Sequence, residues 1–178
     1  MVICAVAIVL FICFTVASCK DPGYLKPAHS FLDLLKDVHP CEMCPDCKVL
    51  RSSRSRHCAI CRRCVERFDH HCPWVNNCVG VGNHNAFLGF IFSLILELAL
   101  MIASSVISLK AKAFKHSDEW PMQALCMFKV CEKTWVRDPI IIANIVFCGM
   151  IILPAGTLCL VQTKNYLHNK TTSERLSR

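Results

Sequence analysis

The chain has 178 residues, a length that accommodates one or two compact units. Its apolar fraction of 54% and its mean hydropathy of +0.42 are high for a soluble domain and point to membrane spans. The formal net charge is +7, and the 15 cysteines indicate either a disulfide framework or metal sites. An ordinary soluble domain is therefore disfavoured. Whether the cysteines form disulfides or bind metal depends on the cellular compartment that they face.

Three apolar stretches predict transmembrane helices, at residues 2–19, 86–109 and 139–163. The second contains one charged residue, Glu97, and the third contains none. The first is at the short end of the length that a spanning helix needs, about 20 residues. A cleaved signal peptide is the alternative for this stretch. It lacks a basic segment at its start, so we predict a retained span.

The placement of Lys and Arg predicts the orientation of these spans. Ten of the 20 basic residues lie in 20–85, six in 110–138 and four in 164–178. Three spans put the first and last of these segments on one side, which carries most of the basic residues and would be cytosolic. The loop 110–138 would then be lumenal. Because the cytosol is reducing, metal binding or catalysis is the expected use of the clustered cysteines.

Residues 20–43 form a predicted linker in which Asp21-Pro22-Gly23 predicts a turn that ends the first helix. A cysteine-rich domain follows at 44–87. Seven cysteines and three histidines lie between 44 and 78, and three gaps between successive cysteines are two residues long. This spacing lets one short turn present two sulfurs to one metal ion.

The number of ligands in this domain exceeds what two zinc sites require. Two closed tetrahedral sites need eight ligands, which leaves one cysteine and one histidine over. Cys41 forms a competing two-residue gap with Cys44, so the first ligand pair has two possible registers. The domain is poor in apolar residues, and metal binding is expected to supply its folding free energy.

The tetrapeptide DHHC at 69–72 and the cysteine spacing around it resemble the cysteine-rich domain of the DHHC protein S-acyltransferases, or palmitoyltransferases. The resemblance extends to 21–23 and to the sequence TTSE at 171–174, which matches the family's TTxE element. It implies two structural zinc ions with interleaved ligand sets and selects the register that begins at Cys44. The first set would be Cys44, Cys47, His57 and Cys64, and the second would be Cys58, Cys61, His71 and Cys78.

The resemblance also implies roles for the residues that the zinc sites leave over. In an extended strand alternate side chains share a face, so His70 and Cys72 would point one way and His71 the other. Cys72 would be the nucleophile, His70 the base that accepts its proton, and Asp69 the group that orients His70. A regular strand would aim Asp69 away from His70, so the backbone has to turn there.

The implied reaction is a two-step transfer of a long-chain acyl group. Cys72 would take the acyl group from an acyl-CoA co-substrate, most commonly palmitoyl-CoA, and pass it to a cytosolic cysteine of a membrane-associated protein. The family usually has at least four spans, so the first would be missing here. A catalytically idle, membrane-anchored zinc module that acts as an adaptor is therefore the alternative interpretation.

Basic residues decorate the zinc domain and suggest two kinds of anionic ligand. They form either a solvated face attracted to anionic lipid headgroups or contacts to the phosphates of acyl-CoA. Nucleic acid is not expected as a partner, because the domain is tethered to a membrane. The candidate acyl-CoA contacts are Arg51, Arg54, Arg62, Arg63 and Arg67.

The predicted fold is an α-helical multi-pass membrane protein with three transmembrane helices, a small cytosolic double-zinc domain and a cytosolic tail at 164–178. The expected location is the endomembrane system: the Golgi, the endoplasmic reticulum or the plasma membrane. Within the second span, Glu97 is expected to form a structural hydrogen bond to another helix, with Asn144 of the third span as the candidate.

Overall fold

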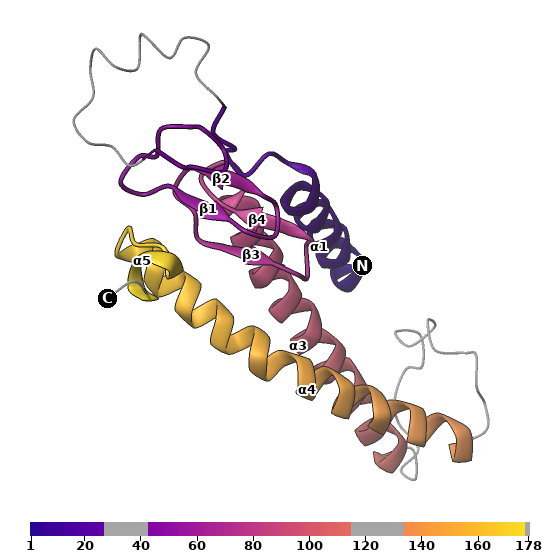
Figure 1. Cartoon of the computed structure of the whole chain (residues 1–178). Coiled ribbons are helices and arrows are strands. Elements are labelled where there is room, and N and C mark those ends of the chain that lie inside the picture. The colour runs from indigo at the N-terminus through magenta and orange to yellow at the C-terminus, as the bar shows by residue number, and fades with distance from the viewer. Residues whose placement is uncertain (27–42, 115–133, 177–178) are drawn as a thin grey trace.

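The computed structural model describes residues 1–26, 43–114 and 134–176, and all structural statements below refer to these (Figure 1). Most of the predicted linker 20–43, including Cys41, and most of the predicted loop 110–138 lie outside them. The described helices are α1 (Val2–Cys19), α3 (His84–Phe114), α4 (Thr134–Leu167) and α5 (Thr172–Leu176). The strands are β1 (Arg56–Cys58), β2 (Arg63–Val65), β3 (His70–Cys72) and β4 (Asn77–Val79).

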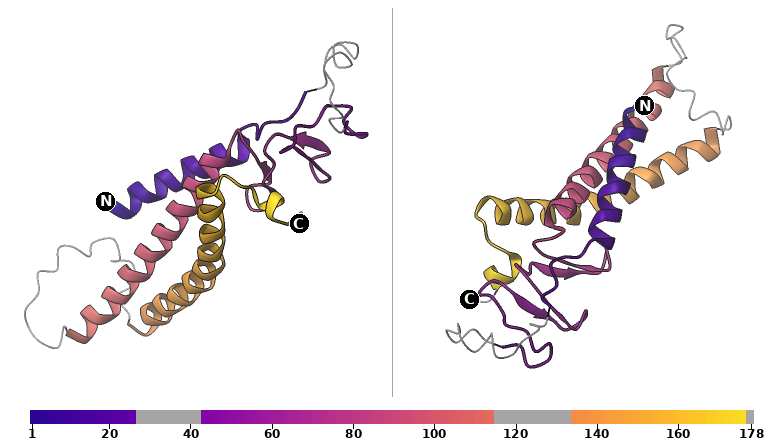
Figure 2. Two further views of the ribbon diagram at one scale, coloured as in Figure 1. Left: turned by 90° about the vertical axis from the view of Figure 1, so that its left-hand side faces the viewer. Right: turned by 90° about the horizontal axis from the view of Figure 1, so that it is seen from above.

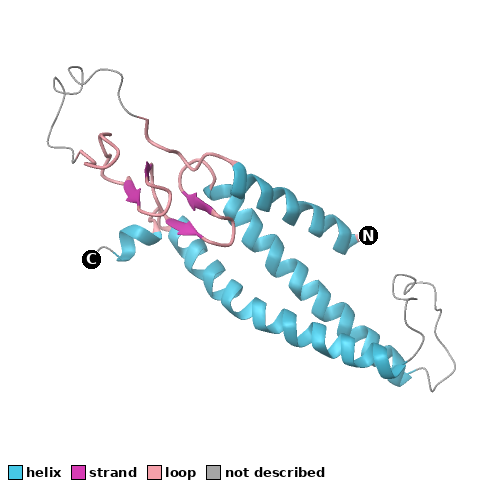
Figure 3. Ribbon diagram, turned by 45° about the vertical axis from the view of Figure 1, so that its right-hand side comes forward, coloured by secondary structure: helices cyan, strands magenta, loops and turns pink. Residues whose placement is uncertain are grey.

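Three of these helices are long and apolar enough to cross a membrane, which confirms the prediction of three spans. The qualifying stretches are Val2–Cys19, His84–Lys110 and Asp138–Leu167. Helix α3 packs against both α1 and α4, and the strands gather at one end of this bundle (Figures 1 and 3). Most side chains of α1 are exposed and apolar, such as Phe11 and Ile8, as expected for a surface that faces lipid. Pro154 lies inside α4, which curves along its length (Figure 2).

The cysteine-rich domain is built from two short antiparallel hairpins. β1 pairs with β2, and β3 pairs with β4, so each hairpin forms its own two-stranded sheet. In the first hairpin His57 lies opposite Cys64, and in the second His71 lies opposite Cys78. Directly opposite residues point to the same face of a sheet, so each hairpin presents one imidazole and one thiol together.

Two buried asparagines join the zinc domain to the end of α1. The Asn77 amide group donates to the carbonyl oxygens of Ala17, Ser18 and Lys20, at 3.2, 3.1 and 3.0 Å. The Asn83 amide group donates to the Ala17 carbonyl at 3.0 Å. The last carbonyls of a helix have no partner within it, so these amides satisfy groups that would otherwise be unpaired. They fix the position of α1 against β4, the strand in which Asn77 lies opposite Cys72.

The Asp21-Pro22-Gly23 turn packs against the loop that leads from β4 into α3. The Asp21 Oδ1 atom accepts the backbone N–H groups of Gly23 and Tyr24, both at 2.8 Å, which fixes the turn locally. The Pro22 carbonyl accepts the Gly82 N–H at 3.0 Å. The turn therefore does more than end the helix, because the Gly23 carbonyl also accepts the Glu66 N–H at 2.8 Å and the turn so links the end of β2 to the loop after β4.

Replacing Gly80 by alanine is expected to lower the free energy of unfolding by about 1–3 kcal/mol. The added Cβ would lie 2.5 Å from the Pro22 carbonyl oxygen and 2.6 Å from Val65 Cγ1, and the first of these is backbone that cannot easily move. The midpoint of thermal unfolding of the purified chain measures the effect. Gly149→Ala is the matched control, because no described atom lies within 4 Å of its added Cβ. An equal midpoint for both variants would contradict the close approach.

Polar contacts inside the helix bundle differ from the pairing expected for Glu97. The Asn144 side chain donates to Ser105 Oγ at 3.0 Å and accepts from Cys148 Sγ at 3.6 Å. Glu97 Oε2 is buried and has no hydrogen-bond partner among the described residues. Asn144 therefore links α3 to α4 through Ser105, one of the few buried polar residues of α3.

Candidate active site

Two clusters of cysteine and histidine side chains can hold metal ions, one at each hairpin. Within each cluster the four ligand atoms lie within 4.8 Å of one another. The first cluster consists of Cys44, Cys47, His57 and Cys64, and the second of Cys58, Cys61, His71 and Cys78. The ligand sets therefore interleave along the chain as the resemblance implied, because His57 and Cys58 are neighbours that belong to different clusters.

The spacing of the ligand atoms suits tetrahedral zinc. The three sulfurs of the first cluster lie 3.2–3.8 Å from His57 Nδ1. Those of the second lie 3.4–3.8 Å from His71 Nδ1. Bonds of about 2.3 Å to sulfur and about 2.0 Å to nitrogen give tetrahedral edges of roughly 3.6 Å. Three thiolates and one imidazole complete the coordination of zinc, so such an ion would stabilise the fold and leave no position for a substrate.

The opposite face of β3 carries the residues that the clusters leave over. His71 points to the second cluster, so the strand alternation directs its neighbours His70 and Cys72 to the other face. Cys72 is 2% exposed and packs with Ala17 of α1 and with Phe87 and Ile91 of α3. The thiol thus lies where the zinc domain meets the membrane helices.

Asp69 directly precedes β3, and its buried side chain accepts hydrogen bonds from three residues. Its Oδ2 atom accepts His70 Nδ1–H at 2.7 Å and the amide of Gln162 at 2.8 Å. The Thr172 N–H donates to Oδ1 at 2.6 Å, and the Thr172 hydroxyl donates to Oδ2 at 3.0 Å. Burial alone would raise the pKa of Asp69, but the hydrogen bonds from His70, the Thr172 N–H and Gln162 lower the pKa to about 2.

His70 lies between Asp69 and Cys72 and interacts with both. Burial would lower the pKa of His70, but its hydrogen bonds to Asp69 and Cys72 raise the pKa to about 9. Burial would raise the pKa of Cys72, but His70 and the backbone N–H groups of Val75 and Trp74 lower it. Phe87 packs edge-on against the His70 ring, with centroids 5.2 Å apart, and so fixes the plane of the imidazole. The arrangement favours a thiolate beside an imidazolium.

The segment TTSE at 171–174 is held against the zinc domain by a second set of contacts. The Arg54 guanidinium binds the Glu174 carboxylate through two nitrogens, at 2.6 and 3.2 Å. Glu174 also accepts the Thr171 N–H at 2.8 Å, while Thr171 Oγ1 accepts the Glu174 N–H at 3.2 Å, which is a capping box. The same short helix, α5, therefore contacts the zinc domain at Arg54 and delivers Thr172 to Asp69.

The structure separates the five candidate acyl-CoA contacts into different environments. Arg54 binds Glu174 and Asn169, and Arg67 donates to Asn169 Oδ1 at 2.6 Å. The Arg63 guanidinium lies over the Tyr24 ring, 4.3 Å from its centroid, and is exposed. Arg62 is also exposed, whereas Arg51 is half-buried. Arg54 and Arg67 therefore have structural partners, and a soluble phosphate can reach Arg62 and Arg63 most directly.

One residue of the site, Gln162, has no signal in the sequence motifs. Gln162 is 1% exposed and comes from the end of α4, 93 positions after its partner Asp69. A polar side chain close to the end of an apolar run is the only indication that could have pointed to Gln162.

A scan against protein families matches residues 38–178 to the model described as DHHC palmitoyltransferase. The chain belongs to the DHHC palmitoyltransferase family. The match covers the whole zinc domain, α3, α4 and the TTSE segment, which includes every residue that surrounds Asp69. The family assignment thus confirms the resemblance drawn from the DHHC tetrapeptide.

Curated relatives agree with this assignment. Palmitoyltransferase Hip14 of Drosophila melanogaster is 39% identical over 105 residues, which are 54% of this chain and 16% of that protein. Palmitoyltransferase ZDHHC4 of Bos taurus is 38% identical over 112 residues, 57% of this chain and 32% of the relative. Palmitoyltransferase ZDHHC14 of Danio rerio is 34% identical over 166 residues, 87% and 32% of the two chains. The chain thus spans about a third or less of these relatives.

Proposed function

We propose that this chain is a protein S-acyltransferase that works through a thioester on Cys72. It would carry a long-chain acyl group, most commonly palmitoyl, from acyl-CoA to cysteines of membrane-associated proteins. The observation that carries the proposal is the chain of contacts from Asp69 through His70 to Cys72, on the face of β3 opposite the metal cluster. The zinc domain would lie on the cytosolic side of the Golgi, endoplasmic reticulum or plasma membrane.

In the first step the Cys72 sulfur attacks the carbonyl carbon of the acyl-CoA thioester. The bond from that carbon to the sulfur of coenzyme A breaks, and the acyl group stays on Cys72. His70 takes the proton of the thiol and gives it to the departing coenzyme A sulfur. Asp69 holds the His70 ring in one orientation and stabilises its positive charge.

In the second step a cysteine of the substrate protein takes the acyl group. Its thiol gives a proton to His70, its sulfur attacks the acyl carbon, and Cys72 leaves as the thiolate. The helix bundle suits this chemistry, because Cys72 lies among apolar side chains of α1 and α3 at the end of the spans. Each CH₂ of the acyl chain gains about 0.8 kcal/mol from an apolar environment, so the chain would lie along the helices while its thioester stays at the surface.

Phosphates of acyl-CoA would bind basic residues of the zinc domain. Of the five arginines proposed for this, Arg62, Arg63 and Arg67 are exposed, and Arg62 and Arg63 suit the role best because Arg67 already donates to Asn169. Arg51 is half-buried and belongs to the same domain. Arg54 binds Glu174, and Arg67 binds Asn169. These two arginines would attract the phosphates through their positive charge rather than by direct contact.

The test is metabolic labelling of the membrane-expressed chain with an alkyne-tagged palmitate, followed by hydroxylamine treatment. A label that hydroxylamine removes, and that Cys72→Ser abolishes, is the expected result. Cys19→Ser is the matched control, because Cys19 is an exposed thiol at the end of α1 and should not affect the label. Equal labelling of the Cys72→Ser chain would overturn the role of Cys72. No label on a zinc-loaded chain would favour the idle adaptor.

Replacing Gln162 by leucine is expected to slow acyl-enzyme formation about tenfold, because a hydrogen bond to the Asp69 carboxylate is lost. Gln162 acts through Asp69 and not on the substrate. The rate at saturating palmitoyl-CoA should therefore fall while the KM for palmitoyl-CoA and the zinc content stay constant. Thr163→Val is the control. Thr163 is next to Gln162 in the sequence, but its hydroxyl contacts Cys159 Sγ, at 4.0 Å, rather than Asp69. A raised KM with an unchanged maximal rate would contradict a positioning role.

A further inference from the structure

A cavity of about 390 Å³ lies where the end of α4 meets the segment that leads into α5. Its volume falls in the range of small-molecule sites. Its lining belongs neither to the metal clusters nor to the Asp69–His70–Cys72 arrangement. The lining residues are Lys164, His168, Lys170, Glu174 and Arg175.

The lining is strongly basic, because its only carboxylate already has a cationic partner. Glu174 pairs with the Arg54 guanidinium at 2.6 Å, so these two opposite charges offset each other and the two lysines and Arg175 leave the region with a net positive charge. Lys164 and Lys170 are exposed and converge from α4 and from the segment before α5. Like charges held close together repel one another, and an anion between them would relieve that repulsion.

Arg175 has a hydrogen-bonding capacity that its surroundings do not use. Its Nη2 group donates to the Lys164 carbonyl at 3.4 Å, a long contact. Its Nε atom is buried and has no hydrogen-bond partner among the described residues. A buried donor without an acceptor is unfavourable, so a shift of the Arg175 guanidinium toward an oxyanion in the adjacent cavity would be favourable.

The cavity lies at the level where a membrane span ends. The apolar stretch of α4 runs from Asp138 to Leu167, and Lys164 is in its last turn. The Tyr166 and Leu167 side chains beside it are exposed, as aromatic and apolar groups at a membrane surface commonly are. Lipid headgroups carry their phosphates at this depth, and basic pockets beside membrane helices bind acidic headgroups.

The geometry points to a binding site for a phosphate-bearing ligand in this cavity, and an acidic phospholipid headgroup is the source that its depth favours. The phosphate would bridge Lys164 on α4 to Lys170, just before α5, and to Arg175, within α5. Coenzyme A also carries phosphates and is the other source of the same chemistry.

An occupied cavity would hold α5 in place. The same short segment supplies Glu174 to Arg54 and Thr172 to Asp69, so a bridge to α4 would favour the docked position of Thr172. Acidic lipid would then speed acyl-enzyme formation, an effect that rests on the proposed function. Binding of the phosphate-bearing ligand does not depend on the proposed function, and it is measured without any acyl donor.

The test uses the full chain with Cys72→Ser in detergent micelles. Binding of a fluorescent dioctanoyl phosphatidylinositol 4-phosphate is measured by fluorescence anisotropy. Saturable binding is expected. Each of Lys164→Gln and Lys170→Gln should weaken it about fivefold, and the double variant about 25-fold. Lys20→Gln is the matched control, because Lys20 is an exposed lysine at the end of α1, on the same side of the bundle but outside the cavity. Arg175→Gln is a second variant, and zinc content verifies that each chain is folded.

Competition assigns the source of the phosphate. Displacement by unlabelled phosphatidylinositol 4-phosphate but not by coenzyme A supports the lipid site. Displacement by coenzyme A supports the phosphate site and assigns it to that cofactor. Equal displacement by dioctanoyl phosphatidylcholine, or unchanged affinity in the lysine and Arg175 variants, overturns the site. Since this chain lacks Cys72, a failure here is distinguishable from a failure of the acyltransferase proposal.

Discussion

Replacing Asp69 by asparagine is expected to lower the rate of acyl-enzyme formation by about 10²- to 10⁴-fold. The carboxylate accepts donors from His70, Thr172 and Gln162, at distances of 2.6–3.0 Å. Asparagine has only one acceptor oxygen, and its NH₂ group, which is itself a donor, would face N–H and O–H donors with which it cannot form hydrogen bonds. The His70 ring would lose the partner that fixes its orientation and that stabilises its positive charge.

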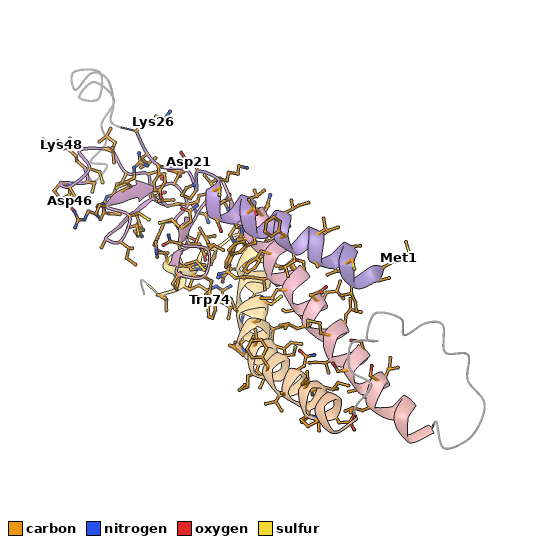
Figure 4. All side chains as sticks on the ribbon, turned by 90° about the vertical axis from the view of Figure 1, so that its right-hand side faces the viewer. Met1, Asp21, Lys26, Asp46, Lys48 and Trp74 are labelled. Atoms are coloured by element: carbon orange, nitrogen blue, oxygen red, sulfur yellow. The ribbon has the colours of Figure 1, made fainter. Side chains whose placement is uncertain are left out.

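A single-turnover experiment with palmitoyl-CoA, stopped by acid at short times, measures this rate directly. Asp46→Asn is the matched control, because it makes the same chemical change on a side chain that is 72% exposed. Figure 4 shows Asp46 at the far end of the zinc domain, away from the helices. An Asp69→Asn chain that keeps its zinc and reacts within threefold of the unmodified rate would contradict the role of Asp69.

The features that the sequence predicted best are those that depend on local pattern. The three spans follow from long apolar runs, which have few alternatives to a helix in a membrane. The separation of His70 and Cys72 from His71 follows from the two-residue period of a strand, and the register with β4 places them accordingly. The Asp69 carboxylate does reach His70 Nδ1, at 2.7 Å, but the chain turns at Glu66 and Arg67 and not at Asp69, where the turn was expected.

The contacts that sequence reasoning could not provide join distant segments. Gln162 belongs by composition to the third apolar run, and nothing local indicates that α4 ends beside Asp69. Arg54 and Glu174 are 120 positions apart, so neither charge identifies the other as its partner. Asn77 and Asn83 satisfy the last carbonyls of α1, a role that depends on where that helix ends in space. Such contacts follow from the packing of helices against the zinc domain.

Removal of a metal ligand is expected to have the other large effect, because the zinc domain has little apolar core of its own. Its buried apolar groups form small clusters around the ligands themselves, such as Val49 with Cys44 and Cys64. Structural zinc contributes about 10–16 kcal/mol to the folding of small zinc domains, far more than clusters of this size can supply. Cys78→Ser should therefore unfold the second hairpin and abolish acyl labelling, although Cys78 is not part of the reacting group.

The reason for this coupling is the register of β3 with β4. Cys78 lies opposite His71, and the strand pairing that this ligand pair supports also holds His70 and Cys72 in place. Metal analysis of the purified chain should give two zinc ions in the unmodified protein and at most one in Cys78→Ser. Limited proteolysis should then cut within 44–87. Cys4→Ser, an exposed cysteine of α1, should keep both ions and its resistance to protease. A Cys78→Ser chain that retains two zinc ions and full labelling would show that the second cluster does not hold the active strand.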